Sequence, residues 1–398
     1  MKFGLERLLA DKSLAKSFGR CGLLSNQASL LEGFVPSWQA LMQLLSKDLT
    51  TLFSPQHGFE ATVQDNMIET AHSIHEPSGR RLYSLYSETR EPTEKMLADV
   101  DTILVDIQLS GCRVYTFKYT IAACLRAAKK YQKKVVILDR PNPLGGVVVE
   151  GSVLSMDATS FVGEFPIPMR HGLTAAEIAL LFNKDIGADL SCIAMQGWQP
   201  EKTFSQTGRY WIPTSPNLPT LESALVYPGT VLLEGINASE GRGTTLPFQL
   251  VGAPYVPSQD AFVAKLKEIL GDLAPQNAFR PAAFQPTSQK WSGKECRGCQ
   301  IFVDPCSADF PSYAVGLAVM RAFIEFGGQS RGFEWKAPPY EYDLETLPIK
   351  LIMGSQKADE KLLASDFSLN DPFWREGQKE YLDKTKDILL YDRQRKLV

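Results

Sequence analysis

The sequence lacks an apolar run long enough to cross a membrane. A spanning helix needs about 20 consecutive apolar residues, and no stretch of the 398-residue chain approaches that length. An export signal is not visible either, because Glu6, Asp11 and Lys12 fall where a signal peptide carries its apolar segment. We therefore expect a cytoplasmic protein, or an exported one if the start of the chain has been trimmed or misassigned.

The chain also lacks an excess of either charge. It has 42 Lys and Arg residues against 45 Asp and Glu residues, which gives a net charge of −3. Proteins that bind nucleic acids or anionic membranes typically carry a strongly basic surface, so we expect neither as a partner. A small anionic ligand held by a few arginines is compatible with this balance.

Disulfide and metal frameworks are poorly supported by the cysteines and histidines. The seven cysteines are odd in number and mostly scattered, which is typical of reduced thiols. His72 and His75 have a spacing found in zinc sites, but a catalytic zinc needs a third protein ligand. Cys296, Cys299 and Cys306 lack a convincing fourth ligand. We expect no metal.

Three common catalytic motifs are missing from the chain. No G-x-G-x-x-G follows an expected strand, no Walker A sequence occurs, and no G-x-S-x-G is present. The sequence therefore gives no support to a nucleotide cofactor or to a hydrolase built on a serine nucleophile elbow.

What is present is an alternation of short apolar runs with helical patterns, which indicates βαβ units and a mainly parallel sheet. We expect strands over residues 21–25, 50–54, 102–107, 134–138 and 190–195, and helices over 37–45, 119–131 and 174–182. The Pro-, Ser- and Asn-rich segment 211–229 suggests a domain boundary near residue 225. Beyond it we expect helices near 259–270 and 313–326 and a strand at 300–303.

Polar residues follow four of the expected strands, where ligands bind in open parallel sheets. They are Asn26; Gln56 and His57; Asp106, Gln108 and Arg113; and Asp139, Arg140 and Asn142. Any one of them fits a turn or a helix cap, but the four groups together favour a binding site.

A glycine-rich segment near the expected boundary carries Glu240 and Arg242. Glycines let the backbone approach a ligand closely, and an arginine there can hold a carboxylate through two hydrogen bonds. The alternative is a turn with a surface ion pair.

These motifs occur in the same order in one known family. They are Gly22-Leu23-Leu24-Ser25-Asn26, Pro55-Gln56-His57-Gly58, Asp106-Ile107-Gln108, Asp139-Arg140-Pro141-Asn142-Pro143, His171-Gly172-Leu173-Thr174, Ser215-Pro216-Asn217, Tyr227-Pro228-Gly229-Thr230, Glu234-Gly235-Ile236-Asn237, Ser239-Glu240-Gly241-Arg242-Gly243-Thr244 and Pro339-Tyr340-Glu341-Tyr342. Over nearly its whole length the chain resembles the exo-β-N-acetylmuramidase family of peptidoglycan-recycling glycosidases, long catalogued as a domain of unknown function.

The resemblance implies an α/β protein with a Rossmann-like domain, residues 1–225, that carries most of the active site. It also implies a smaller α+β auxiliary domain, residues 226–398, with the cleft between the two. The implied activity is release of N-acetylmuramic acid from the non-reducing end of β-1,4-linked peptidoglycan fragments, without a nucleotide cofactor. The oligomeric state stays open.

Gln56 departs from the family pattern, because many relatives carry Glu before the histidine. An amide cannot exchange a proton at neutral pH, whereas glycoside hydrolysis ordinarily needs two carboxyl groups. Another acid such as Glu60, Asp65 or Glu69 could serve, the substrate's acetamido group could replace the protein nucleophile, or this branch has lost or changed the activity.

We predict Glu240 as the general acid, with a pKa raised by burial, and Asp106 as the second carboxylate. His57 is expected to assist proton transfer or to bind a sugar hydroxyl. Predicted substrate-binding residues are Gln56, Arg113, Asp139, His171, Asn217 and Arg242, the two arginines being candidates for the lactyl carboxylate. The alternatives are a glycosidase of shifted specificity, a non-catalytic amino-sugar binding protein and, more distantly, a metal hydrolase.

Overall fold

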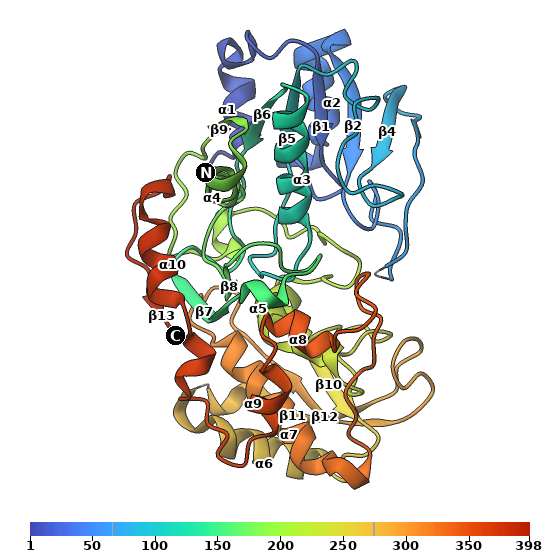
Figure 1. Cartoon of the computed structure of the whole chain (residues 1–398), viewed down its shortest axis with the longest axis vertical. Helices are drawn as coiled ribbons and strands as arrows, with labels where there is room; N and C mark the ends of the chain where they lie inside the picture. Colours follow the sequence, from blue (N-terminus) through green and yellow to red (C-terminus); the bar gives the residue numbers. More distant parts are fainter. Residues whose placement is uncertain (66, 274) are drawn as a thin grey trace.

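The computed structural model describes residues 1–65, 67–273 and 275–398. Its N-terminal half is built on a seven-stranded sheet in the order β3-β4-β2-β1-β5-β6-β9 (Figure 1). The pairs from β4 to β9 are parallel, and β3 is an antiparallel edge strand. The strands of this sheet are β1 (Cys21–Leu24), β2 (Leu49–Ser54), β3 (Ser73–His75), β4 (Arg80–Ser84), β5 (Thr102–Val105), β6 (Lys134–Leu138) and β9 (Asp189–Ile193).

Helices cover both faces of this sheet, because its central strands are apolar on both sides. Ile103 and Val105 of β5 belong to the core that packs beneath α3 and α4, whereas Leu104 faces the core beneath α1 and α2. This alternation is expected for a doubly wound sheet. The four helices are α1 (Gly4–Ala10), α2 (Ser37–Leu45), α3 (Phe117–Lys130) and α4 (Ala175–Ile186). The predicted α/β class with a mainly parallel sheet is confirmed.

The C-terminal part is smaller and contains an antiparallel sheet in the order β10-β12-β11. Helix α6 packs on β11 and β12, and α7 packs on α5 and α6. The elements of this part are α5 (Leu221–Thr230), β10 (Leu250–Ala253), α6 (Gln259–Leu270), β11 (Phe279–Phe284), β12 (Cys296–Ile301), α7 (Ser312–Arg331), α8 (Pro348–Met353) and α9 (Ala358–Leu363).

The end of the chain returns to the N-terminal part. Figure 1 shows α10 (Gln378–Lys384) beside α4, on the same side of the molecule as the N-terminus. Strand β13 (Lys396–Leu397) completes a small sheet with β7 (Val148–Val153) and β8 (Pro168–Arg170). Buried contacts from the tail, such as the Arg393–Glu177 ion pair at 2.6 Å, fix it there.

One predicted strand differs from the structure in its extent, and close backbone packing accompanies the difference. The strand expected at 300–303 is observed as β12, which is central in its sheet and begins earlier. Its Gly298 lies so close to β10 that a Cβ atom would be 2.0 Å from the Val251 carbonyl oxygen. The predicted boundary near residue 225 falls inside α5, and the division into domains at that residue stays a prediction.

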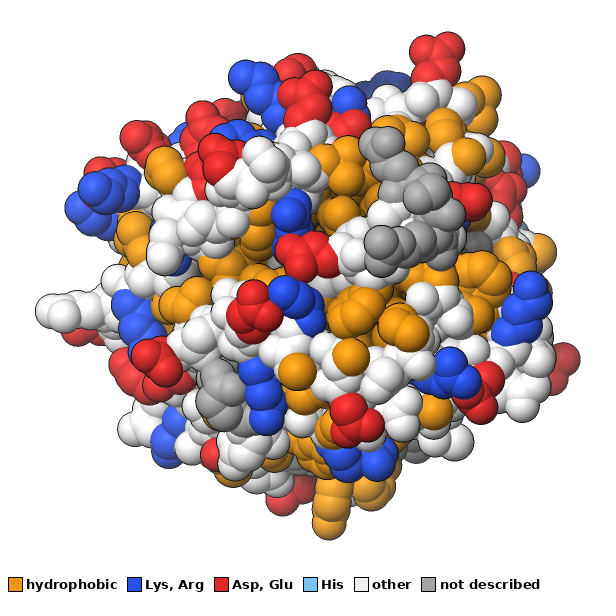
Figure 2. Space-filling model, turned by 90° about the horizontal axis from the view of Figure 1, so that it is seen from below, with side chains coloured by type: hydrophobic (Ala, Val, Ile, Leu, Met, Phe, Trp, Pro, Cys, Tyr) orange, Lys and Arg blue, Asp and Glu red, His pale blue; other side chains and the backbone are white. Residues whose placement is uncertain are grey.

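None of the described helices is both long and apolar enough to span a membrane. Figure 2 views the molecule from the side of the C-terminal part, and on that face acidic and basic side chains are interspersed with apolar ones.

Candidate active site

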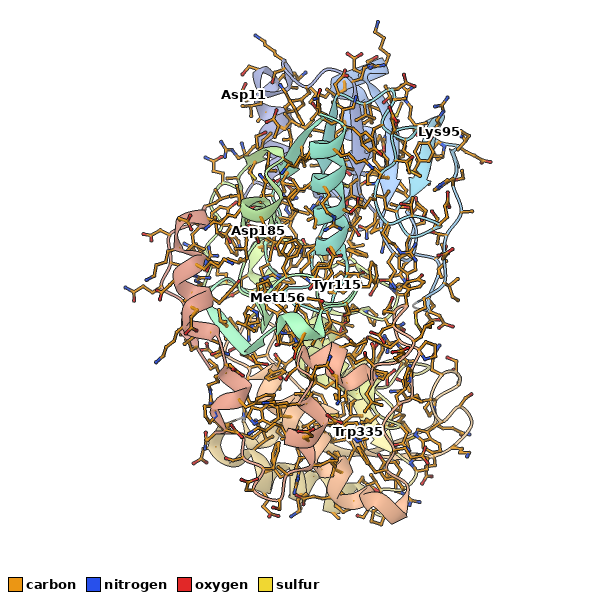
Figure 3. All side chains as sticks on the ribbon, in the orientation of Figure 1. Asp11, Lys95, Tyr115, Met156, Asp185 and Trp335 are labelled. Carbon is orange, nitrogen blue, oxygen red and sulfur yellow. The ribbon has the colours of Figure 1, made fainter. Side chains whose placement is uncertain are left out.

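A narrow pocket of about 50 Å³ opens between the N-terminal sheet and the C-terminal part. The loop after β2 provides Gln56 and His57, and the segment that leads into α3 provides residues 114–117. Figure 3 shows Tyr115, one of these residues, where the two parts of the molecule meet. The C-terminal part contributes Glu234, Arg242, Tyr340 and Glu341 to the opposite wall.

Gln56 connects the two walls of this pocket. The Thr116 hydroxyl donates to Gln56 Oε1 at 2.7 Å, and Gln56 Nε2 faces Glu341 Oε1 at 3.4 Å. The Tyr86 hydroxyl donates to the other oxygen of Glu341 at 3.0 Å. The carboxyl group of Glu341 therefore accepts hydrogen bonds from an amide and a phenol, and the residue is buried.

Glu234, the second carboxylate that lines the pocket, belongs to an ionic network. Arg242 donates to Glu234 at 2.6 Å and to Glu240 at 2.8 Å. The Tyr340 hydroxyl donates to Glu234 at 2.7 Å, and Lys290 donates to Glu240 at 2.8 Å. Two cations thus balance two carboxylates in a largely buried cluster.

Glu240 is placed behind Arg242 and is not among the residues that line the pocket. Burial alone would raise the pKa of this carboxyl, but the adjacent Lys290 and Arg242 outweigh it and lower the pKa to about 2. The expectation of a raised pKa is therefore wrong, because the buried group lies between two cations. An ionised Glu240 has no proton to donate at neutral pH.

His57 is held in the pocket by a hydrogen bond to the backbone carbonyl of Val63. Its Nδ1 is 2.7 Å from the Val63 carbonyl oxygen, which can accept a hydrogen bond but not donate one. Burial lowers the pKa of the ring, so the imidazole is neutral with its proton on Nδ1. Its Nε2 therefore carries a lone pair that can accept a hydrogen bond or a proton.

Asn217 lines the same pocket through a paired amide contact. Asn217 Nδ2 donates to the Gln64 carbonyl at 3.1 Å, and Gln64 Nε2 donates to Asn217 Oδ1 at 3.3 Å. The amide is fixed in orientation at the pocket wall.

Comparisons with known proteins agree with this architecture. The family model described as exo-beta-N-acetylmuramidase NamZ, N-terminal, matches residues 21–222, and the corresponding C-terminal model matches residues 225–391. The chain belongs to the exo-β-N-acetylmuramidase NamZ family. The predicted family is thus confirmed.

Relatives of this NamZ-family chain include an enzyme and solved structures. The peptidoglycan beta-N-acetylmuramidase NamZ of Bacillus subtilis (strain 168) is 41% identical over 321 residues, which are 80% of this chain and 76% of the relative. A DUF1343 family protein from Bacteroides fragilis NCTC 9343 superimposes with a TM-score of 0.83 at 28% identity, covering 98% of this chain and 99% of that chain. A second protein of that family and strain has a TM-score of 0.72 at 24% identity, covers 99% of both chains and shows the fold alone.

Of the residues predicted for the site of this NamZ-family chain, Gln56, His57, Asn217 and Arg242 line the pocket. Asp106 does not. It is fully buried and forms two hydrogen bonds with Arg140, at 2.6 and 2.9 Å. This placement does not fit the predicted role as second catalytic carboxylate, because the pair is engaged away from the pocket.

Arg113 is also turned away from the pocket. Its guanidinium is fully buried and donates to the backbone carbonyls of Ser152, Ile167 and Ile352, at 2.9, 3.2 and 3.0 Å. It ties β7 to the C-terminal part and is not placed to receive the lactyl carboxylate of a substrate, contrary to the sequence-based expectation.

Asp139 and His171 are fully buried structural groups in this fold. Asp139 accepts hydrogen bonds from the Thr174 hydroxyl at 2.9 Å and the Tyr391 hydroxyl at 2.6 Å, and burial raises its pKa to about 7. His171 Nδ1 accepts from the backbone N–H of Leu173 at 3.1 Å. Asp139 anchors the start of α4 and the chain end, and His171 holds the turn before α4; neither lines the pocket wall where sugar binding was predicted.

Sequence reasoning missed Glu234 and Glu341 as site residues. Both stand in motifs that carry the family resemblance, Glu-Gly-Ile-Asn and Pro-Tyr-Glu-Tyr, so the signal was present. Within the described residues, no group of three or more His, Cys, Asp and Glu side chains is arranged to hold a metal ion.

Proposed function

We propose that this chain is a glycoside hydrolase that releases N-acetylmuramic acid from the non-reducing end of β-1,4-linked peptidoglycan fragments. The observation that carries this proposal is the 41% identity with a peptidoglycan beta-N-acetylmuramidase over 80% of the chain. The pocket supports it with two carboxyl groups, Glu234 and Glu341, among amide and imidazole groups that suit sugar hydroxyls.

Glu341 is the general acid in this proposal. Gln56 has no proton to give, and Glu240 is held ionised by Lys290 and Arg242. Glu234 is already engaged by Arg242 and by the Tyr340 hydroxyl. Glu341 lines the pocket as a buried carboxyl group that accepts hydrogen bonds from Gln56 and Tyr86, and its place at the pocket wall lets it reach the glycosidic oxygen of a bound substrate.

The proposed reaction starts when Glu341 transfers its proton to the glycosidic oxygen while the bond from that oxygen to C1 breaks. The 2-acetamido oxygen of the muramic acid attacks C1 from the opposite face and forms a cyclic intermediate. Water then opens this ring at C1, and its proton returns to the Glu341 carboxylate. His57 Nε2, as a neutral acceptor, orients that water or a sugar hydroxyl.

Asn217 and Gln56 are the proposed binding groups, and Arg242 supports the pocket wall. The forked donors of Arg242 already lie on Glu234 and Glu240, so the arginine supplies the pocket with rigidity and local charge balance. Asn217 and Gln56 present amides to the substrate. A soluble peptidoglycan fragment is the proposed partner, in the cytoplasm.

The test is an endpoint assay with the disaccharide MurNAc-β-1,4-GlcNAc. We expect the wild type to release free MurNAc, and Glu341→Gln to lower the rate by about 100- to 10,000-fold, the range typical of a general acid. Glu345→Gln is the matched control, because Glu345 is an exposed glutamate nearby in the chain.

Other outcomes would redirect the proposal. If the wild type binds the disaccharide tightly without release, the chain is an amino-sugar binding protein, for which Gln56 is the favouring observation. If it neither binds nor cleaves it, the specificity has shifted to another glycan. If the wild type is active and Glu341→Gln retains full activity, the function stands and the assignment of Glu341 is wrong.

A further inference from the structure

A second pocket, larger than the catalytic one, lies at the carboxyl ends of β1, β5 and β6. Its volume is about 190 Å³, and its lining includes the turn after β1, Gln108 after β5 and Arg140 after β6. β1 lies between β2 and β5, so the chain order reverses beside it, and ligands of open α/β sheets bind at such switch points. A cavity of about 150 Å³ can hold one six-membered ring, so this pocket has room for a single ring.

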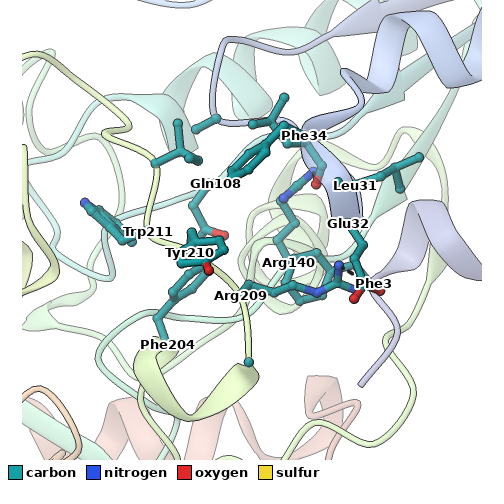
Figure 4. A pocket seen from close by; sticks show the side chains of 15 residues that line it. Phe3, Leu31, Glu32, Phe34, Gln108, Arg140, Phe204, Arg209, Tyr210 and Trp211 are labelled. Atoms are coloured by element: carbon teal, nitrogen blue, oxygen red, sulfur yellow. Dashed lines mark hydrogen bonds and ion pairs between the residues drawn. The ribbon is translucent and has the colours of Figure 1, made fainter.

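Aromatic side chains form the walls of this pocket, and two of them are exposed at its mouth. Phe34 is 57% exposed and Tyr210 is 78% exposed. Their rings stack with centroids 5.7 Å apart and planes 26° apart. Phe204 and Trp211 lie next to them, and Figure 4 shows these rings around Gln108. Exposed, clustered aromatic faces mark a binding surface more often than chance.

Gln108 supplies a fixed acceptor in the lining. Its Nε2 donates to the carbonyls of Leu109 and Pro141, at 2.9 and 2.8 Å, which sets the orientation of the amide. Its Oε1 is buried and has no hydrogen-bond partner among the residues that the structure describes. Leaving a buried acceptor unsatisfied is costly, so this oxygen favours a ligand that brings an N–H or O–H donor.

Both arginines that line the pocket already have carboxylate partners. Arg140 is paired with Asp106, and Arg209 is paired with Glu6 at 2.6 Å and with Glu32 at 3.4 Å. An anionic ligand therefore gains little here, and an uncharged one is favoured. A pyranose ring presents an apolar C–H face to aromatic side chains and hydroxyl or acetamido donors to an acceptor at the same time.

We propose that this aromatic pocket binds one uncharged N-acetylhexosamine ring, at a site separate from the catalytic pocket. A hydrogen bond links the two pockets. The Trp211 indole N–H donates to the carbonyl of Leu218, a residue of the catalytic pocket, at 3.1 Å. The ring can come from the free sugar or from a distant residue of a longer glycan.

Calorimetric titration with N-acetylglucosamine tests the proposal and needs no turnover. We expect saturable binding to the wild type and an affinity about fivefold lower for Tyr210→Ala, since one aromatic contact is lost. Phe302→Ala is the matched control, because Phe302 is 45% exposed in the C-terminal part, and it is expected to bind like the wild type. Tyr210 is exposed, so its substitution leaves the fold intact.

No binding of the sugar, or equal binding by the wild type and Tyr210→Ala, overturns the proposal. The proposal is also overturned if adenine binds more tightly than the sugar in the same titration and Tyr210→Ala weakens that binding. The source of the ring is resolved by steady-state kinetics on the disaccharide and on a peptidoglycan tetrasaccharide. A KM raised by Tyr210→Ala for the tetrasaccharide alone identifies a glycan residue, and unchanged KM values with weaker sugar binding identify the free sugar.

Discussion

The carboxyl ends of β2 and of β5 carry similar polar residues but have different environments. After β2, Gln56 and His57 line the candidate catalytic pocket, and Gln56 contacts the C-terminal part through Glu341. Directly after β5, Asp106 is fully buried against Arg140, a residue that follows β6. The side chains after β2 therefore line a pocket, whereas the carboxylate that follows β5 is satisfied by its own ion pair.

A charged residue at the end of a strand therefore does not by itself indicate a catalytic or binding role. A charged pair that is completely desolvated has its hydrogen-bonding groups satisfied by each other. The amide and imidazole after β2 keep acceptor or donor capacity at the pocket wall.

The buried pair after β5 is expected to matter for stability. Asp106→Ala leaves the Arg140 guanidinium buried without its carboxylate, and breaking such a pair costs about 3–5 kcal/mol. Urea unfolding at neutral pH measures this loss. The double variant Asp106→Leu with Arg140→Met removes both charges and should recover most of the stability. A loss below about 1 kcal/mol for Asp106→Ala would place the pair with ordinary surface ion pairs.

The ionic cluster behind the catalytic pocket is expected to make stability depend on acid. The pKa of Glu240 is lowered to about 2 in the folded protein, below that of an unfolded glutamate. The unfolded state therefore binds more protons as the pH falls, and the stabilisation, present above about pH 4.5, is lost towards pH 2. A shift of this size corresponds to roughly 3 kcal/mol.

Urea unfolding at pH 6, 4 and 3 checks this expectation. Glu240→Gln should be less stable than the wild type at pH 6 and should approach it at pH 3. Glu201→Gln, an exposed glutamate, is the control and should follow the wild type throughout. Parallel curves for the wild type and Glu240→Gln would show that the cluster does not hold this carboxylate ionised.

Regular periodicity of apolar residues made many helices and strands of the N-terminal half predictable from the sequence. The helix predicted over 37–45 matches α2, and the one predicted over 174–182 overlaps α4, which Thr174 caps through its hydroxyl. Helix α5 was missed because Pro228 and Gly229 are typical of loops. Gly229 instead allows α7 to approach, since a Cβ atom there would lie 1.8 Å from the Ser312 carbonyl oxygen.

The candidate site was less predictable because it is assembled across long sequence separations. Gln56 and Glu341 meet from opposite ends of the chain, and no local pattern shows that contact. The same limit applies to Glu240, whose pKa is set by Lys290, a residue from another loop. Type and spacing identified the segments, while tertiary packing decided which side chain faces the pocket.

The smallest expected effect concerns the contact between Gln56 and Glu341. Gln56→Glu places a second carboxyl group about as close to Glu341 as the amide is now, 3.4 Å from Oε1. Two carboxyl groups at this distance share a proton, and the apparent pKa of the pair rises. If Glu341 is the general acid, the high-pH limb of kcat/KM on the disaccharide moves up by about one pH unit.

Gln64→Glu is the matched control, because Gln64 also lines the pocket but contacts Asn217 instead of Glu341. It adds the same charge without forming a carboxyl pair, so its high-pH limb should move much less. An equal movement in both variants would mean that the general field of the pocket, rather than the Gln56–Glu341 contact, controls the proton. An unchanged limb in Gln56→Glu would show that Glu341 does not take part in proton transfer. The carboxyl ends of β2 and β5 would then differ in exposure and not in chemistry.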